Sequence, residues 1–91
     1  MSQIESEGAS LVQRASAVKR AYQAELLSKA NVVGVGVGYR TIGGQRTDDI
    51  SLVVMVTKKV PQTQLSPQDI VPDEIDGIPV DIQEVGIVRA Q

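Results

Sequence analysis

The chain has 91 residues, a formal net charge of −2 and a hydrophobic content of 42%, yet it contains no Phe or Trp. A chain of this length cannot enclose two separate cores, so we expect a single domain with an aliphatic core. Cys and His are both absent, which excludes disulfides, thiolate or imidazole catalysis and the usual ligands of zinc and copper. No cofactor is expected.

The composition also constrains the compartment and the partners. The first residues carry no positive leader, and no run approaches the roughly 20 apolar residues of a membrane span, so we expect a cytoplasmic protein without membrane association. Arg89 is the only cation after Val60, which argues against a nucleic-acid partner for that acidic half. Domains of this size bury only about 60% of their unfolded-chain surface, which favours a homo-oligomer.

An amphipathic helix is predicted first, over residues 10–29. Ser10 and Gln13 form a capping box at its start, and Asn31 suits the left-handed position that ends a helix. Residues 1–9 are predicted to be flexible. The predicted apolar face has residues at spacings of three and four, namely Leu11, Ala15, Val18, Tyr22 and Leu26.

A strand in which Val and Gly alternate, residues 32–40, is the most informative feature of the chain. Its alternation puts one set of side chains on one face and leaves the other face as bare backbone. Each Gly inside a regular element costs about 0.5–1 kcal/mol relative to Ala, so we infer that something comes very close to the bare face. The glycine face consists of Gly34, Gly36 and Gly38, and the opposite face of Val33, Val35, Val37 and Tyr39.

Three interpretations of the glycine face remain open. The helix of residues 10–29 packs across it, or a second copy or partner protein contacts it, or it binds phosphate. A dinucleotide fingerprint needs its glycines in the turn that opens a helix, and no Gly-Lys-Ser/Thr follows, which disfavours phosphate. The seven residues of the two faces are the candidate interface, and a tight contact predicts that Gly36→Val destabilises the fold or abolishes association.

The rest of the chain predicts further strands. The run beginning at Ile50 alternates as a strand, and the Gly43-Gly44 pair permits a turn with positive φ. We therefore expect a hairpin with a long tip over residues 41–49, which pairs this strand antiparallel to residues 32–40. Residues 60–72 are predicted to form a loop with a helical turn near Ser66-Pro67. Asp76-Gly77 suits a two-residue hairpin turn.

The last strand is predicted to run from Val80 to Ile87, with a possible bulge at Gly86. The predicted fold class is α+β, with one N-terminal amphipathic helix packed on a three- to four-stranded antiparallel or mixed sheet. The domain covers residues 10–88, and residues 89–91 form a C-terminal tail.

No arrangement of residues predicts an enzyme or a metal site. A Ser-His-Asp triad is impossible without His. The acidic residues between Asp73 and Glu84 lack the spacing of a calcium loop and are interpreted as a solvated rim. Lys58-Lys59, with Arg40 and Arg46, is interpreted as a guard against unwanted pairing at a strand edge.

Many short stretches together resemble a known region. They include Asn31 to Tyr39, Ile50 to Val56, Leu65-Ser66-Pro67 and Ile75 to Asp81. Over residues 11–86, the chain resembles the amino-terminal region that precedes the catalytic domain in a group of bacterial trypsin-like serine peptidases. The resemblance implies an accessory module, serving as a folding aid, an inhibitory cover or an assembly surface, and it assigns no catalytic residue to any position.

The function expected from these observations is that of a non-enzymatic protein-binding or self-assembling accessory module. The alternative is an inhibitor or chaperone-like partner of a separately encoded trypsin-like serine peptidase. The first expectation depends on the glycine face, and the second depends on the resemblance.

Overall fold

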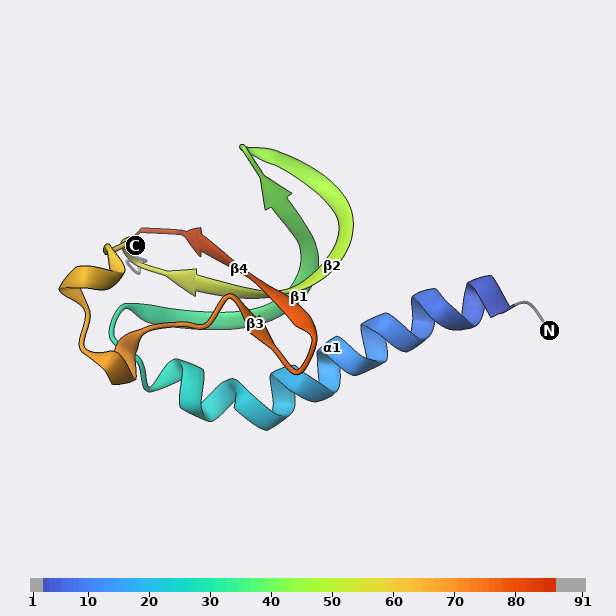
Figure 1. Ribbon diagram of the computed structural model, residues 1–91, viewed down its shortest axis with the longest axis horizontal. Coiled ribbons are helices and arrows are strands. Elements are labelled where there is room, and N and C mark those ends of the chain that lie inside the picture. The colour runs from blue at the N-terminus through green and yellow to red at the C-terminus, as the bar shows by residue number, and fades with distance from the viewer. Residues whose placement is uncertain (1–2, 87–91) are drawn as a thin grey trace, which may run out of the picture.

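The computed structural model describes the backbone of residues 3–86 and the side chains from Ser10 to Gly86. One helix is followed by a sheet in the order β1-β2-β4-β3, in which β2 and β4 are parallel and the other neighbours antiparallel (Figure 1). The predicted α+β class is therefore confirmed, with a mixed sheet of four strands. The elements are α1 (Gln3–Leu27), β1 (Val32–Ile42), β2 (Gln45–Val56), two 3-10 turns η1 (Gln62–Gln64) and η2 (Pro67–Asp69), β3 (Glu74–Ile75) and β4 (Ile78–Glu84).

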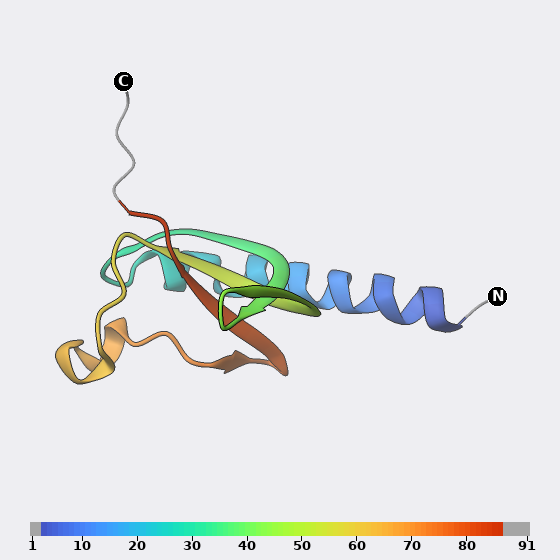
Figure 2. The ribbon, with the colours of Figure 1, turned by 90° about the horizontal axis from the view of Figure 1, so that it is seen from above.

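α1 is longer at its start than the sequence predicts. It begins at Gln3 rather than Ser10, so Ser10 lies inside the helix and is not its cap. The added turns contain Glu and Ala and no Pro, which lets the helix continue without help from the core. Its N-terminal half extends beyond the sheet (Figures 1 and 2). The helix ends at Leu27, and Asn31 has the predicted left-handed conformation, with φ of 70°.

The core lies between α1 and one face of the sheet. Leu52 and Val54 on the central strand β2 are fully buried, and the helix contributes Ala15 and Leu26 to the same cluster. Because no Phe or Trp is present, this cluster is built almost entirely from branched aliphatic side chains and Ala. β2 therefore carries the centre of the fold.

The turns lie at the predicted glycines, but the first hairpin has a two-residue turn and not the predicted long tip, because the strands continue to Ile42 and from Gln45. Gly43 and Gly44 connect β1 and β2 with φ of 58° and 79°, and Asp76 and Gly77 connect β3 and β4 with φ of 51° and 82°. These left-handed pairs are the conformation that a two-residue hairpin requires. The predicted helical turn at Pro67 is η2.

The strand irregularities lie elsewhere than predicted. β4 ends at Glu84, so Gly86 follows the strand and forms no bulge in it, and the predicted strand end at Ile87 lies outside the described residues. Instead, β1 shifts register between Val32 and Gly34 and again between Tyr39 and Thr41. The first shift leaves Val33 of β1 without a partner in the ladder, and the second leaves Arg40 of β1 opposite three unpaired residues of β2, Thr47 to Asp49, so the hairpin bends and twists there.

The far half of the β1–β2 hairpin bends away from α1 (Figure 1). There the backbone N–H of Thr41 donates a hydrogen bond of 3.1 Å to Asp81 Oδ2 on β4, although β1 and β4 are not neighbours in the sheet. Gln83 Nε2 donates to the same oxygen at 3.0 Å. The Asp81 carboxylate thus holds the bent hairpin over the sheet face opposite the helix.

A polar contact joins α1 to the β3–β4 turn. Arg14 Nη2 donates to the backbone oxygen of Asp76 at 3.4 Å, and the Tyr22 hydroxyl donates to Asp76 Oδ1 at 3.5 Å. The Asp76 charge raises the pKa of Tyr22 above its usual 10.0, and desolvation, the hydrogen bond and the charge of Glu25 act in the same direction.

We expect Leu52→Ala to lower the free energy of unfolding by about 2–5 kcal/mol, because the variant leaves a cavity on the central strand. Ile42→Ala is the control, since Ile42 is 53% exposed and its truncation should change stability by less than about 0.5 kcal/mol. Urea denaturation measures both. Equal losses in the two variants would contradict this placement of the core.

Tyr22 should ionise only above its ordinary pKa, because the carboxylate of Asp76 disfavours the tyrosinate. Since the folded pKa is raised, the contact stabilises the fold below about pH 10 and is lost as the pH rises through the raised pKa. In a Tyr39→Phe background, Tyr22 is the only tyrosine, and ultraviolet absorbance follows its titration directly. Adding Asp76→Asn should lower the midpoint, and an unchanged midpoint would rule out this electrostatic contact.

Candidate functional site

The structure divides the predicted interface between two sides of the sheet. Val35 and Val37 pack against the core cluster under α1. The three glycines belong to the opposite face of the sheet, because residues that lie opposite each other on two antiparallel strands share a face. On that side, Gly34, Gly36 and Gly38 lie opposite Met55, Val53 and Ser51 of β2.

α1 therefore does not cover the glycine face, and the first interpretation is wrong. An ideal Cβ at Gly34 would lie 2.8 Å from Met55 Cε, and one at Gly38 would lie 3.3 Å from Val53 Cγ2. The close approach predicted at these two positions comes from neighbouring side chains of the same sheet.

Gly36 differs from the other two glycines. Among the described residues, a Cβ there would meet only Met55 Cε, at 4.0 Å, which is ordinary van der Waals contact. Crowding within the chain thus gives no reason for Gly at this position, and the predicted effect of Gly36→Val on folding has no support from this geometry. The interpretation that a second copy or a partner protein contacts the glycine face therefore stays open.

Val33 and Tyr39 lie at the two register shifts of β1 and are both exposed, by 50% and 41%. The Arg46 guanidinium carbon lies 4.5 Å from the centre of the Tyr39 ring, a cation–π contact across the hairpin. Ser51, which is fully buried, donates from its hydroxyl to the Gly38 oxygen at 3.2 Å. The outer edge of β1 has no strand beside it among residues 3–86.

The geometry does not match a phosphate-binding loop. Such loops present backbone N–H groups from a turn that opens a helix, whereas the three glycines lie within β1 and are followed by β2. Among the described residues, no group of acidic side chains is arranged to hold a metal ion. No helix within residues 3–86 combines the length and apolar content needed to cross a membrane.

Several acidic residues that the sequence places on a solvated rim accept hydrogen bonds within the chain. Besides Asp81 and Asp76, Glu84 Oε1 accepts from the backbone N–H of Lys59 at 2.8 Å. Asp69, which lies before that rim in the sequence, accepts at Oδ1 from the backbone N–H of Ala30 at 3.0 Å. The last two bonds fasten residues 59–69 to β4 and to the segment between α1 and β1, and sequence spacing gives no signal of them because the partners lie 25 and 39 residues apart.

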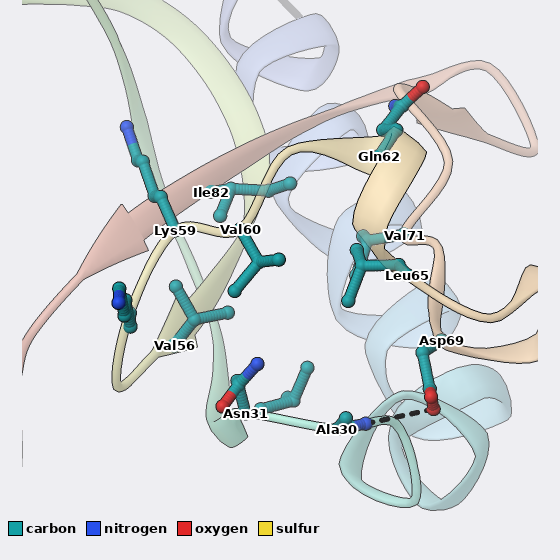
Figure 3. A pocket seen from close by; sticks show the side chains of 12 residues that line it. Ala30, Asn31, Val56, Lys59, Val60, Gln62, Leu65, Asp69, Val71 and Ile82 are labelled. Carbon is teal, nitrogen blue, oxygen red and sulfur yellow. Dashed lines mark hydrogen bonds between the residues drawn. The ribbon is translucent and has the colours of Figure 1, made fainter.

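An apolar pocket of about 250 Å³ lies at the end of the sheet remote from the hairpin turn (Figure 3). Its apolar walls come from β1, β2, β4 and the loop that contains η1 and η2. Polar side chains, including Lys58 and Lys59, stand at its rim. The apolar lining consists of Val32, Val56, Val60, Leu65, Val71 and Ile82.

A family model that describes the NARROW LEAF 1 N-terminal domain matches residues 15–87, which is well over half of the chain. The chain belongs to this family. No curated protein sequence matches it significantly. The match includes the second half of α1, the Val–Gly strand and the pocket, so the glycine face and the pocket both lie within the family domain.

This membership corrects the predicted resemblance. Over nearly the same residues, the matching family is the NARROW LEAF 1 N-terminal domain and not an accessory region of trypsin-like serine peptidases. The resemblance was a set of short matches, many of them at turns and strand ends, and such local patterns recur wherever similar turns are needed. The peptidase partner, which depended on that resemblance, loses its basis.

We expect Gly38→Val to lower the free energy of unfolding by about 1–2 kcal/mol, because its Cβ would lie 3.3 Å from Cγ2 of Val53, whose branched side chain cannot swing aside as the Met55 methyl group beside Gly34 can. Gly36→Val should instead leave stability unchanged or raise it by up to about 1 kcal/mol, since Val suits a strand and the site has room. Chemical denaturation at low protein concentration measures both. Adding Val53→Ala to Gly38→Val should recover part of the loss, and a Gly36→Val variant less stable than Gly38→Val would refute the geometry.

Proposed function

We propose that this chain is a non-enzymatic protein-binding module that self-associates through the glycine face and the outer edge of β1. The observation that carries the proposal is the room above Gly36, where the fold of a single chain accepts a side chain but the sequence has none. A strand residue without a side chain allows another polypeptide to pack directly against the backbone. The cost of Gly in a strand is then offset by close contact with that neighbour.

The edge of β1 supports the same proposal. An edge strand presents unpaired N–H and C=O groups that can pair with another strand, and proteins usually protect such edges with charges or Pro. From Val32 to Tyr39, β1 contains neither. The predicted guards, Arg40 and Arg46, lie at the hairpin end of the strand and leave these eight residues unprotected.

A second copy suits this edge because the pattern is self-complementary. If two β1 strands pair antiparallel about a twofold axis perpendicular to the sheet, residues of one face oppose residues of the same face. Gly then lies opposite Gly, and Val35 lies opposite Val37 or another valine of the helix-facing side. Both copies keep their helices on one side, and the glycine faces join into one bare surface that a second such pair covers, which supplies the close contact at Gly36. A lysine at position 36 would then lie beside its counterpart on the joined surface, where like charges repel, and would also obstruct the covering pair.

The test compares two added charges of the same kind. Gly36→Lys places an ammonium on the glycine face, and Ala24→Lys places one on the exposed surface of α1. Light scattering and sedimentation from micromolar to millimolar concentration should give a mass above that of the monomer for the unmodified chain. Gly36→Lys should shift it to the monomer, and Ala24→Lys should not.

Circular dichroism and thermal unfolding at low concentration check that both variants are folded. A strictly monomeric unmodified chain over the whole concentration range would overturn the proposal. So would a folded Gly36→Lys variant that keeps the full mass.

A further inference from the structure

We propose that the apolar pocket beside Lys58 and Lys59 binds an extended peptide of a partner protein, inserting one large apolar side chain that is flanked by acidic residues. The pocket is built from residues other than the glycine face, so this inference goes beyond the proposed self-association and does not require it.

The size of the pocket favours a single side chain over a whole small molecule. Small-molecule sites enclose about 300–1,000 Å³, and this pocket encloses about 250 Å³ and opens to the surface. Val56 and Val71 belong to the buried core, so an inserted side chain would contact the core directly. Because the chain has no Phe or Trp, no aromatic side chain of these kinds from its own sequence fills the space.

The charges at the rim favour an anionic peptide. Lys58 and Lys59 are exposed there, in a chain whose net charge is −2, and the Lys59 side chain extends outward from the pocket (Figure 3). The one carboxylate in the lining, Asp69, already accepts a hydrogen bond from the Ala30 backbone (Figure 3). Glu84, nearby, accepts from the Lys59 backbone. The lining thus has more positive than negative charge, and its two ammonium groups can pair with carboxylates on both sides of an inserted residue.

A partner protein fits these requirements better than a second copy. The aromatic residue that this chain exposes most clearly is Tyr39, and it lies beside Arg40 with Arg46 over its ring. Docking of this ring would therefore bring two guanidinium groups toward Lys58 and Lys59, which carry the same charge. A segment with an aromatic or large aliphatic residue between Asp or Glu residues matches both the apolar lining and the rim.

The test uses the absence of Trp from the chain. A blocked tripeptide Asp-Trp-Glu supplies the only indole in the sample, so its fluorescence reports burial of its side chain without interference from protein Trp. Titration with the full chain to millimolar concentration should give a saturable blue shift. The peptide Lys-Trp-Lys, which differs in charge, should give none.

Two double variants and one single variant test whether the peptide binds in this pocket. Exposed ion pairs contribute about 0.2–1 kcal/mol each, so Lys58→Gln with Lys59→Gln should weaken binding about two- to thirtyfold. Lys19→Gln with Arg20→Gln is the matched control, because it removes two cations from α1 outside the pocket, and it should leave binding unchanged. Val60→Asp, which puts a carboxylate into the lining, should abolish binding.

The absence of a saturable shift, equal binding of the two peptides, or equal losses in the two double variants would overturn the proposal. The Lys58→Gln, Lys59→Gln variant changes only exposed side chains, so a failure of Val60→Asp to fold leaves the test decisive. The Gly36→Lys variant should bind Asp-Trp-Glu normally. Its peptide binding and its mass therefore separate a failure of this inference from a failure of self-association.

Discussion

The strict alternation of side chains across β1 and β2 is the constraint on which the rest of the structure depends. Because successive residues of a strand point to opposite faces, the pairing of Val35 with Val54 and of Val37 with Leu52 commits the valines to the helix side. The glycines are thereby committed to the other side. A shift of register by one residue would exchange the two faces and remove the core, so burial of the valines fixes where the bare backbone lies.

The fold keeps its glycine face free of a second layer of helices. One helix covers one side, and on the other side the bent hairpin is held by the Asp81 carboxylate. In the described residues, Met55 and Val53 are the side chains that lie closest to the glycines. The glycines, Met55 and Val53 thus lie on one face, beside an edge of β1 that has no neighbouring strand in the part of the chain that the structure describes, and the proposed self-association uses both features.

The pocket arises from a different property, the aliphatic core. Branched side chains from three strands meet the loop of η1 and η2 without a large aromatic residue to fill the space between them. Hydrogen bonds from Ala30 to Asp69 and from Lys59 to Glu84 hold the loop and the strand ends around it. Segments held by hydrogen bonds therefore border the pocket, and its two lysines lie at the rim.

The sequence predicts the parts of this structure that depend on neighbours along the chain. The turns at Gly43-Gly44 and Asp76-Gly77, the left-handed Asn31 and the helical turn at Pro67 are confirmed, because each reflects a local backbone preference. The predicted start of α1 is wrong, because the helix begins seven residues earlier, in a part that extends beyond the sheet. The predicted bulge at Gly86 is also wrong, and the two register shifts in β1 have no local signal.

From the sequence by itself came the α+β class, the separation of valines and glycines onto two faces, and the exclusion of chemistry that needs Cys or His. Tertiary structure alone decided which of the two faces the helix covers, that Gly36 has room where Gly34 and Gly38 are crowded, and that a pocket exists. The physical reason is that alternation is a property of one strand. Crowding and cavities depend instead on distances between side chains that are remote in sequence, and those distances exist only once the strands are paired.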